Sequence, residues 1–223
     1  MERSSFQQFD DLSNTDTGGM ISLTYLNITS PNLPFGEQYQ GVNPVEFFEA
    51  VEAVSLNRRE WSFVDLGCGK GRAVLLASLL SFKEAIGVEF SPTLAAIARA
   101  NLTRSKDCQQ QECRASIIDA DAADYMFTAD KIFLYLFNPF TSPVMERVIA
   151  NLVHACEHRS AEAVVAYLLP FCHELFVRSN AFEVISLGPV KQVIHQNVPR
   201  RLNKFACYRF KRPSAPRTSA AGT

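Results

Sequence analysis

The stretch that decides the fold is Phe63-Val64-Asp65-Leu66-Gly67-Cys68-Gly69-Lys70-Gly71-Arg72. Its apolar start predicts a buried strand, and an acidic residue and three glycines at alternate positions follow where that strand ends. Glycine tolerates positive φ and has no Cβ, so Gly67, Gly69 and Gly71 let the backbone turn tightly and approach a ligand closely. We therefore predict a strand, a ligand-binding turn and a helix in immediate succession.

Apolar strands and amphipathic helices alternate on both sides of this stretch. The expected strands span residues 61–66, 84–89, 113–118, 131–137, 163–169, 182–187 and 204–210. The expected helices begin near Pro44, Arg72, Pro92, Pro143 and Cys172. This alternation is typical of an α/β fold with a mostly parallel sheet and helices on both faces. Ligands of such folds lie beyond the carboxyl ends of the strands, where every motif discussed below falls.

Length and composition indicate one domain with tails. The 223 residues are 47% hydrophobic, which is enough for a sizeable core. Residues 1–35 are polar and lack periodicity, which predicts an N-terminal arm or cap, and residues 213–223 predict a disordered tail. The folded domain is therefore expected between residues 36 and 212.

The charge distribution excludes a strong general attraction to nucleic acid or to anionic membranes. The net charge is −1, but residues 191–212 carry seven basic and no acidic side chains. These basic residues are Lys191, Arg200, Arg201, Lys204, Arg209, Lys211 and Arg212. The segment predicts either a solvated basic face or a docking site for an acidic partner.

The six cysteines form no CxxC pair and no metal-ligand spacing, so we expect free thiols and no metal site. The polar N-terminus does not resemble a signal peptide, and no apolar run approaches the length of a membrane span. These features predict a cytoplasmic protein without a membrane partner.

Three nucleotide-binding interpretations compete for the glycine turn. A phosphate-binding P-loop needs Gly-Lys-Ser/Thr, but here Lys70 is followed by Gly71. A dinucleotide turn needs Gly-x-Gly-x-x-Gly, whereas this spacing is Gly-x-Gly-x-Gly with Asp65 just before it, which leaves an NAD-dependent oxidoreductase as a weak alternative. A carboxylate is unfavourable beside pyrophosphate and favourable beside a cation, such as the ammonium or sulfonium of S-adenosylmethionine.

Two further acids end the neighbouring strands. Glu89 ends the strand Ile86-Gly87-Val88-Glu89-Phe90, where it could accept both ribose hydroxyls. Asp121 follows the third strand and is the expected partner of the adenine amino group, with Asp119 as the alternative in register. The complete set of predicted cofactor-binding residues is Tyr39, Asp65, Gly67, Cys68, Gly69, Gly71, Glu89, Phe90, Asp121 and Ala122.

Residues 63–102 resemble the class I S-adenosylmethionine-dependent methyltransferases, and the resemblance extends over about residues 39–187. It closely resembles a group of small bacterial members with the signature Phe-Val-Asp-Leu-Gly-x-Gly-Lys-Gly-Arg. The resemblance implies S-adenosylmethionine as cofactor and a single-domain, Rossmann-like fold with a seven-stranded sheet. Its last strand, here residues 204–210, would be antiparallel and lie beside the fifth strand. In this class, Tyr39 falls where a lid often closes over the methionine moiety.

The segment Asn138-Pro139-Phe140, after the fourth strand, is the predicted catalytic segment. It resembles the Asn/Asp-Pro-Pro-Tyr/Phe motif of amino methyltransferases that act on adenine. That resemblance implies that the Asn138 side chain and the Pro139 carbonyl hold the amine hydrogens while Phe140 stacks on the substrate. This chain has one proline instead of two, and the alternative is a simple turn in which Phe140 packs on the cofactor.

These observations predict a methyltransferase that modifies an amine nitrogen of a protein or a small molecule, although the acceptor itself has no sequence signature. The alternatives are an adenine-specific nucleic-acid methyltransferase, which is not favoured, and a non-catalytic module that binds S-adenosylmethionine. The four histidines, at positions 154, 158, 173 and 195, are expected to be surface or capping residues and not catalysts.

Overall fold

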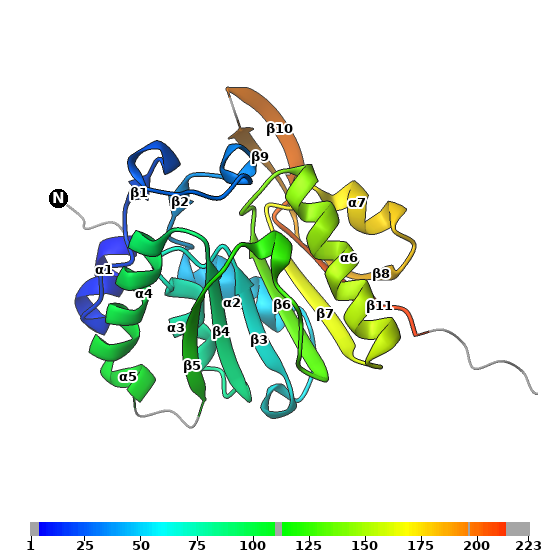
Figure 1. The fold of residues 1–223 in the computed structure, drawn as a ribbon, viewed down its shortest axis with the longest axis horizontal. Helices are drawn as coiled ribbons and strands as arrows, with labels where there is room; N and C mark the ends of the chain where they lie inside the picture. Colours follow the sequence, from blue (N-terminus) through cyan, green and yellow to red (C-terminus); the bar gives the residue numbers. More distant parts are fainter. Residues whose placement is uncertain (1–4, 110–112, 196, 213–223) are drawn as a thin grey trace, which may run out of the picture.

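A seven-stranded sheet forms the centre of the computed structural model, which describes residues 5–109, 113–195 and 197–212 (Figure 1). In spatial order its strands are β5 (Arg114–Asp119), β4 (Glu84–Glu89), β3 (Ser62–Leu66), β6 (Lys131–Phe137), β7 (Glu162–Leu168), β11 (Phe205–Phe210) and β8 (Phe182–Leu187). The first five are parallel, and β11 is antiparallel to both β7 and β8. This confirms the predicted α/β, Rossmann-like sheet with an antiparallel strand inserted beside the fifth parallel strand. The predicted tail, residues 213–223, lies outside the described residues.

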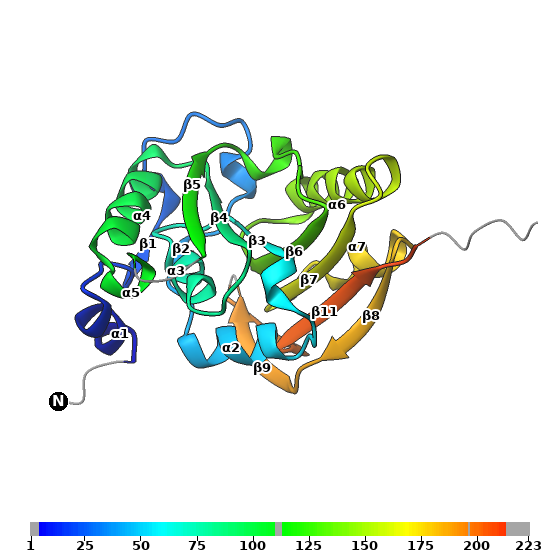
Figure 2. The ribbon, with the colours of Figure 1, turned by 90° about the horizontal axis from the view of Figure 1, so that it is seen from below.

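Helices cover both faces of the sheet because alternate residues of each strand face opposite sides. Along β6, Ile132 and Leu134 enter one core cluster, whereas Phe133 and Tyr135 enter the other. The helices are α2 (Pro44–Glu52), α3 (Arg72–Ser78), α4 (Pro92–Arg104), α5 (Lys106–Gln109), α6 (Ser142–His158) and α7 (His173–Arg178). The first core cluster includes residues of α6 and α7, and the second includes residues of α2 and α3, so α2 and α6 lie on opposite faces (Figure 2).

The N-terminal strap, residues 5–43, crosses the carboxyl ends of the parallel strands (Figure 1). It begins with α1 (Ser5–Ser13), and two short 3-10 helices follow, η1 (Leu23–Tyr25) and η2 (Leu33–Phe35). Its strands β1 (Met20–Ile21) and β2 (Tyr39–Gln40) pair with each other in an antiparallel arrangement. The sequence alone predicted no elements in this segment.

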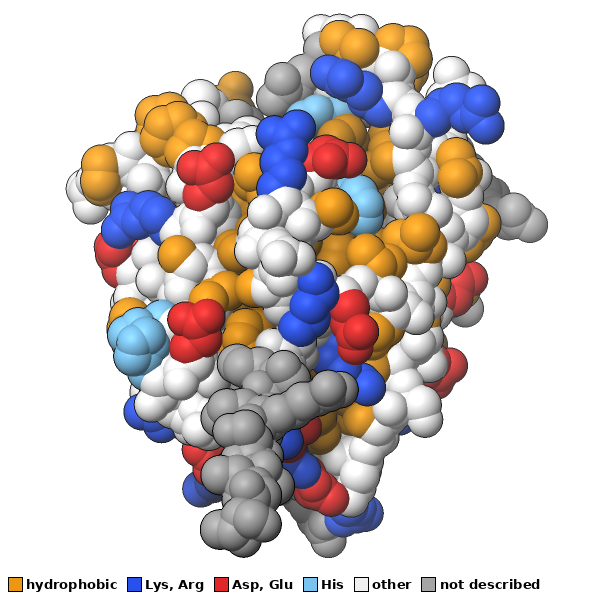
Figure 3. All heavy atoms as spheres, turned by 90° about the vertical axis from the view of Figure 1, so that its right-hand side faces the viewer, with side chains coloured by type: hydrophobic (Ala, Val, Ile, Leu, Met, Phe, Trp, Pro, Cys, Tyr) orange, Lys and Arg blue, Asp and Glu red, His pale blue; other side chains and the backbone are white. Residues whose placement is uncertain are grey.

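A second feature without a sequence prediction is the hairpin of β9 (Val190–His195) and β10 (Val198–Asn203), which connects β8 to β11. It projects beyond the sheet on the same side as the strap (Figure 1). Ile194 is 77% exposed. Figure 3 shows hydrophobic and basic side chains together at this upper end of the molecule.

Much of the basic C-terminal segment is paired with acids of the body. Lys191 Nζ lies 3.0 Å from Glu46 Oε1, and Lys204 forms ion pairs with Glu46 and Glu49. Arg200 and Arg201, on β10, are exposed. The segment therefore offers a smaller basic surface than its sequence suggests.

The described helices include none with the length and apolar character needed to cross a membrane. Within the same residues, His, Cys, Asp and Glu side chains form no group that could hold a metal ion.

Candidate active site

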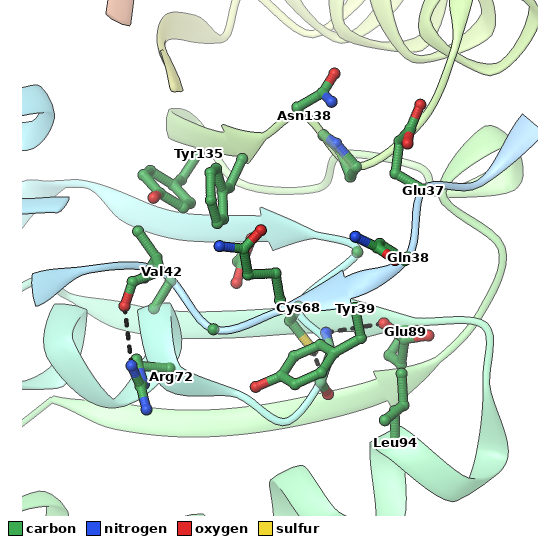
Figure 4. Close-up of a pocket in the computed structure, with 18 of the residues that line it drawn as sticks. Glu37, Gln38, Tyr39, Val42, Cys68, Arg72, Glu89, Leu94, Tyr135 and Asn138 are labelled. Carbon is green, nitrogen blue, oxygen red and sulfur yellow. Dashed lines mark hydrogen bonds between the residues drawn. The ribbon is translucent and has the colours of Figure 1, made fainter. Parts of the chain in front are cut away.

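Two adjoining hollows lie at the carboxyl ends of the parallel strands. The larger has about 620 Å³ of open space between the strap, the glycine turn and the ends of β3, β4 and β6 (Figure 4). The smaller, about 340 Å³, shares Gly67, Phe90 and Pro139 with it. The predicted residues lining the larger hollow are Tyr39, Asp65, Gly67, Cys68, Gly69, Glu89, Phe90, Asn138 and Pro139. Those lining the smaller are Gly67, Phe90, Asp121, Ala122, Pro139 and Phe140.

The glycine turn depends on close approach at two positions with positive φ. A Cβ on Gly67 (φ +78°) would lie 2.7 Å from Cβ of Pro139, and one on Gly69 (φ +55°) would lie 2.2 Å from the ring of Tyr39. Gly71 lines neither hollow and instead starts α3, where it packs against Ala98. The first two glycines therefore shape the hollows, and the third sets the packing of α3 against α4.

Asp65 and Glu89 line the larger hollow together, and both carboxyls are buried. Burial and the charge of Glu89 raise the pKa of Asp65 to about 8. Burial also raises the pKa of Glu89 to about 7, although its Oε2 accepts a hydrogen bond from Gly69 N at 2.8 Å and its Oε1 accepts one from Ser91 N at 2.9 Å. Because each carboxylate oxygen has two lone pairs, Glu89 retains the capacity to accept hydroxyl donors.

Asp121 lies at the edge of the smaller hollow and accepts hydrogen bonds from the strap. Its Oδ2 accepts hydrogen bonds from Asn32 Nδ2 at 2.9 Å and from the hydroxyl of Ser30, and its Oδ1 accepts one from Ala123 N. The walls of this hollow include Val88, Phe90, Ala122, Phe140 and Val144, which make it largely apolar. Asp119, the alternative in register, faces Arg99 at 2.7 Å and lines neither hollow.

Lys70 and Arg72 fasten the strap over the glycine turn, a role that sequence reasoning did not assign. The Arg72 side chain is 2% exposed, and its Nε donates to Thr17 Oγ1 at 2.6 Å while its Nη1 donates to Val42 O at 3.1 Å. Lys70 Nζ lies 2.8 Å from Asp16 Oδ1. Figure 4 shows Arg72 directed at Val42, and Tyr39 lying over the turn. Both cations are thus engaged by the protein itself.

The predicted catalytic segment forms backbone hydrogen bonds with the strap. The Pro139 carbonyl accepts a hydrogen bond from Glu37 N at 3.0 Å, and Gly36 forms an isolated bridge with Phe140. Asn138 has a φ of +38°, and its side chain and that of Glu37 point to the same side, away from the glycine turn (Figure 4). The resemblance to adenine methyltransferases implies that the Pro139 carbonyl accepts an amine hydrogen of the substrate. In this structure the carbonyl already accepts a hydrogen bond from Glu37 N.

Tyr135 adds an unsatisfied polar group to the larger hollow. It is fully buried, and its hydroxyl has no hydrogen-bond partner among the described residues. Burial and the nearby Asp65 raise its pKa, so the hydroxyl is a neutral donor. A buried group of this kind indicates that a ligand or water completes the site.

Comparison with known proteins finds a methyltransferase domain in this chain. The sequence model of the methyltransferase domain family matches residues 63–159, which include the glycine turn, Glu89, Asp121 and Asn138. No curated protein matches this chain in sequence.

Solved methyltransferases share the fold at low identity. A candidate RNA methyltransferase from Pyrococcus horikoshii has 18% identity and a TM-score of 0.55, over 84% of this chain and 94% of its own. The glycopeptide N-methyltransferase MtfA has 12% identity and a TM-score of 0.52, over 75% and 90% of the two chains. The 23S rRNA methyltransferase ErmE has 13% identity and a TM-score of 0.50, over 79% and 70%.

The fold is the Rossmann-like fold that these solved methyltransferases share. The methyltransferase-domain match over residues 63–159, together with this fold, supports an S-adenosylmethionine-dependent methyltransferase with S-adenosylmethionine as its cofactor. The residues present fit this molecule, since one hollow is apolar and the adjoining one holds two buried acids and an unpartnered hydroxyl. The narrower resemblance to small bacterial members stays a prediction.

Proposed function

We propose that the protein methylates an amine nitrogen of a protein or a small molecule. In this proposal, Phe90, Ala122 and Phe140 enclose the adenine and Glu89 accepts the ribose hydroxyls. Asp65 faces the cationic end of the cofactor. S-adenosylmethionine supplies an electrophilic methyl group on a sulfonium.

The observation that carries the amine assignment is the set of carboxyl groups that lines the larger hollow. Glu37, Asp65 and Glu89 line it, while the guanidinium of Arg72 is engaged with the strap. Buried carboxyl groups ionise more readily beside a cation and less readily beside an anion, so this lining favours a cationic amine over the phosphates of a nucleic acid. The pairing of Lys191 and Lys204 with acids of α2 supports the same choice, because it removes part of the basic surface that a nucleic acid would need.

Asn138 is the proposed neighbour of the reacting nitrogen. It lines the larger hollow beside Pro139, at the end of β6. Its side-chain oxygen can accept an amine hydrogen and so orient the nitrogen lone pair, a positioning effect that contributes strongly to catalysis. Phe140 lies in the smaller hollow, in agreement with packing on the cofactor and not on the acceptor.

Binding of S-adenosylhomocysteine tests the cofactor assignment. We expect Glu89→Gln to weaken binding by about tenfold to a hundredfold, because charge-assisted hydrogen bonds to the ribose are worth about 1.5–3 kcal/mol each. Glu84→Gln, at the opposite end of the same strand, is the matched control and should bind as the wild type does. Isothermal titration measures both, and tight binding by Glu89→Gln would refute the ribose assignment.

The acceptor class is tested with tritiated S-adenosylmethionine in a cell lysate, separated into protein, nucleic-acid and small-molecule fractions. Label in the protein or small-molecule fraction, in an acid-stable N-methyl amine, supports the proposal. Label in nucleic acid would replace it with the adenine alternative. Absence of incorporation, with cofactor binding intact, would favour a non-catalytic module.

A further inference from the structure

A carboxylate and an imidazole from distant parts of the chain meet at the mouth of the larger hollow. His195 Nε2, on β9, lies 3.2 Å from Glu37 Oε1, on the strap. Both side chains are mostly buried, with exposed fractions of 24% and 21%. We infer that Glu37, positioned by His195, is the subsite that binds the charged nitrogen of a primary ammonium acceptor. This inference rests on the proposed amine methylation and adds the acceptor's charge state and its ligand.

The backbone fixes Glu37 beside the proposed reacting position. Its N–H donates to the Pro139 carbonyl at 3.0 Å, directly after Asn138. Glu37 and Asn138 both line the larger hollow, and their side chains point the same way in the view of Figure 4. A bound ammonium has no lone pair, so it must first lose one proton, which the Glu37 carboxylate can accept. The Asn138 amide oxygen can then accept a hydrogen of the neutral amine while its nitrogen attacks the methyl group and S-adenosylhomocysteine leaves.

Of the three acids that line the larger hollow, Asp65 and Glu89 are assigned to the cofactor, and Glu37 is available for the acceptor. Asp65 and Glu89 are buried beside the glycine turn, and Glu89 bonds to that turn. Glu37 lies on the strap, across Pro139 from the turn. The Glu37 side chain is only 21% exposed, and a carboxylate shielded from water in this way favours a cation over a neutral group of the same shape.

Two further contacts fix the position of His195 beside the Glu37 carboxylate. Its ring lies 4.1 Å from the ring of Phe171, centroid to centroid, next to the first turn of α7. The hairpin that carries it is anchored from outside by Lys191 and Glu46. The same neighbourhood includes the Cys172 thiol, whose pKa is raised by burial and also by Glu37, so it stays neutral beside the pair.

The experiment compares two small probes on the protein saturated with S-adenosylhomocysteine. The probes are n-butylammonium, which carries the charge, and 1-butanol, which is close to it in shape and neutral. Ligand-observed NMR titration at millimolar concentration gives both dissociation constants. We expect the wild type to bind butylammonium at least about tenfold more tightly than butanol, and we expect Glu37→Gln to abolish this difference.

Glu46→Gln is the matched control, because it removes a carboxylate that anchors the hairpin but does not line the hollow. It should keep the tenfold preference. Glu37→Asp, which retains the charge, serves as a second variant if Glu37→Gln does not fold and should keep part of the preference. His195→Gln, whose amide can still donate to Glu37, should keep the preference, whereas His195→Leu should reduce it.

Two results would overturn the inference: equal binding of the two probes by the wild type, or a preference that survives in Glu37→Gln. Either result with intact S-adenosylhomocysteine binding leaves the proposed function standing. Loss of S-adenosylhomocysteine binding by the wild type itself would remove the proposed function as well, so the two failures are distinguishable.

Discussion

Asp65 shows how the site is built at a cost to folding. Its carboxyl is 4% exposed at the end of β3, and burial together with Glu89 raises its pKa to about 8. A raised carboxyl pKa means that the folded protein holds the proton more tightly than the unfolded chain does. The contribution of Asp65 to the free energy of unfolding is therefore fully present at low pH and is lost as the pH rises toward 8. The buried charge becomes favourable only when a cation lies beside it.

We therefore predict that Asp65→Asn stabilises the protein in the absence of cofactor at pH 8. The amide resembles the protonated acid and avoids the cost of a buried charge, so the melting temperature should rise by several degrees. The difference should shrink as the pH is lowered toward 4, where the wild-type carboxyl is protonated in the folded state. Thermal unfolding at pH 4, 6 and 8 measures it, and a gain that is independent of pH would contradict this explanation.

At the scale of elements, the strap is held by polar contacts that span long distances in sequence. Arg72 opens α3 and connects it to Thr17 and Val42, and Asp10 lies 3.5 Å from its Nη2. Lys70 and Asn101 both contact Asp16. Lys70 and Arg72, the two basic residues of the glycine signature, therefore bind the strap. The lysine of a P-loop would instead bind phosphate.

We predict that Arg72→Met destabilises the protein by about 3 kcal/mol, because it leaves buried partners without their charge. Arg99→Met is the matched control: it breaks the exposed pair with Asp119 and should cost less than about 1 kcal/mol. Urea unfolding measures both. Limited proteolysis of Arg72→Met should also cut within residues 14–42 faster than in the control. Equal stability of the two variants would show that the strap does not depend on Arg72.

At the scale of the whole molecule, the strap and the β9–β10 hairpin converge on one end of the sheet and meet through Glu37 and His195 (Figure 1). The hairpin contributes no residue to the three core clusters of the described chain. Its two ends lie together, since Lys204 N donates to Pro189 O at 2.8 Å. The hairpin is therefore an addition to the sheet and its core, and it lies where we propose that the acceptor approaches.

We predict that replacing residues 190–203 with Asn-Gly, which suits a tight turn between β8 and β11, leaves the fold intact. The affinity for S-adenosylhomocysteine should stay within about twofold of the wild type, because the cofactor hollows do not include the hairpin. Methyl transfer to the lysate acceptor should fall by at least about tenfold. Titration and label incorporation measure the two effects, and undiminished transfer would show that the hairpin does not serve the acceptor.

The sheet could be predicted closely from the sequence. The expected strands at 84–89, 131–137 and 182–187 coincide with β4, β6 and β8. β4 and β6 are largely buried and β8 is an edge strand, but all three are short, mostly apolar runs, and this local signal needs no knowledge of partners. The glycine turn and the acids at positions 65, 89 and 121 were located in the same way, because parallel strands bring their carboxyl ends to one edge.

The hairpin and the strap could not be found in this way. Residues of β9 and β10 are exposed or half-buried, so their pattern lacks the contrast between a buried and an exposed face. The strap is fixed by hydrogen bonds that Arg72 and Lys70 donate and Asp121 accepts, and the sequence does not reveal which distant group a polar residue will meet. His195 was expected to be a surface or capping histidine, and only the fold places it against Glu37.

The sequence by itself determined the parallel sheet, its cofactor turn and the class of chemistry, because these follow from local apolar runs and from glycine and acid spacing. The tertiary structure alone decided what covers the turn and what faces the acceptor. Those features depend on pairs such as Arg72 with Thr17 and His195 with Glu37, which lie 55 and 158 residues apart and become neighbours only when the chain is folded.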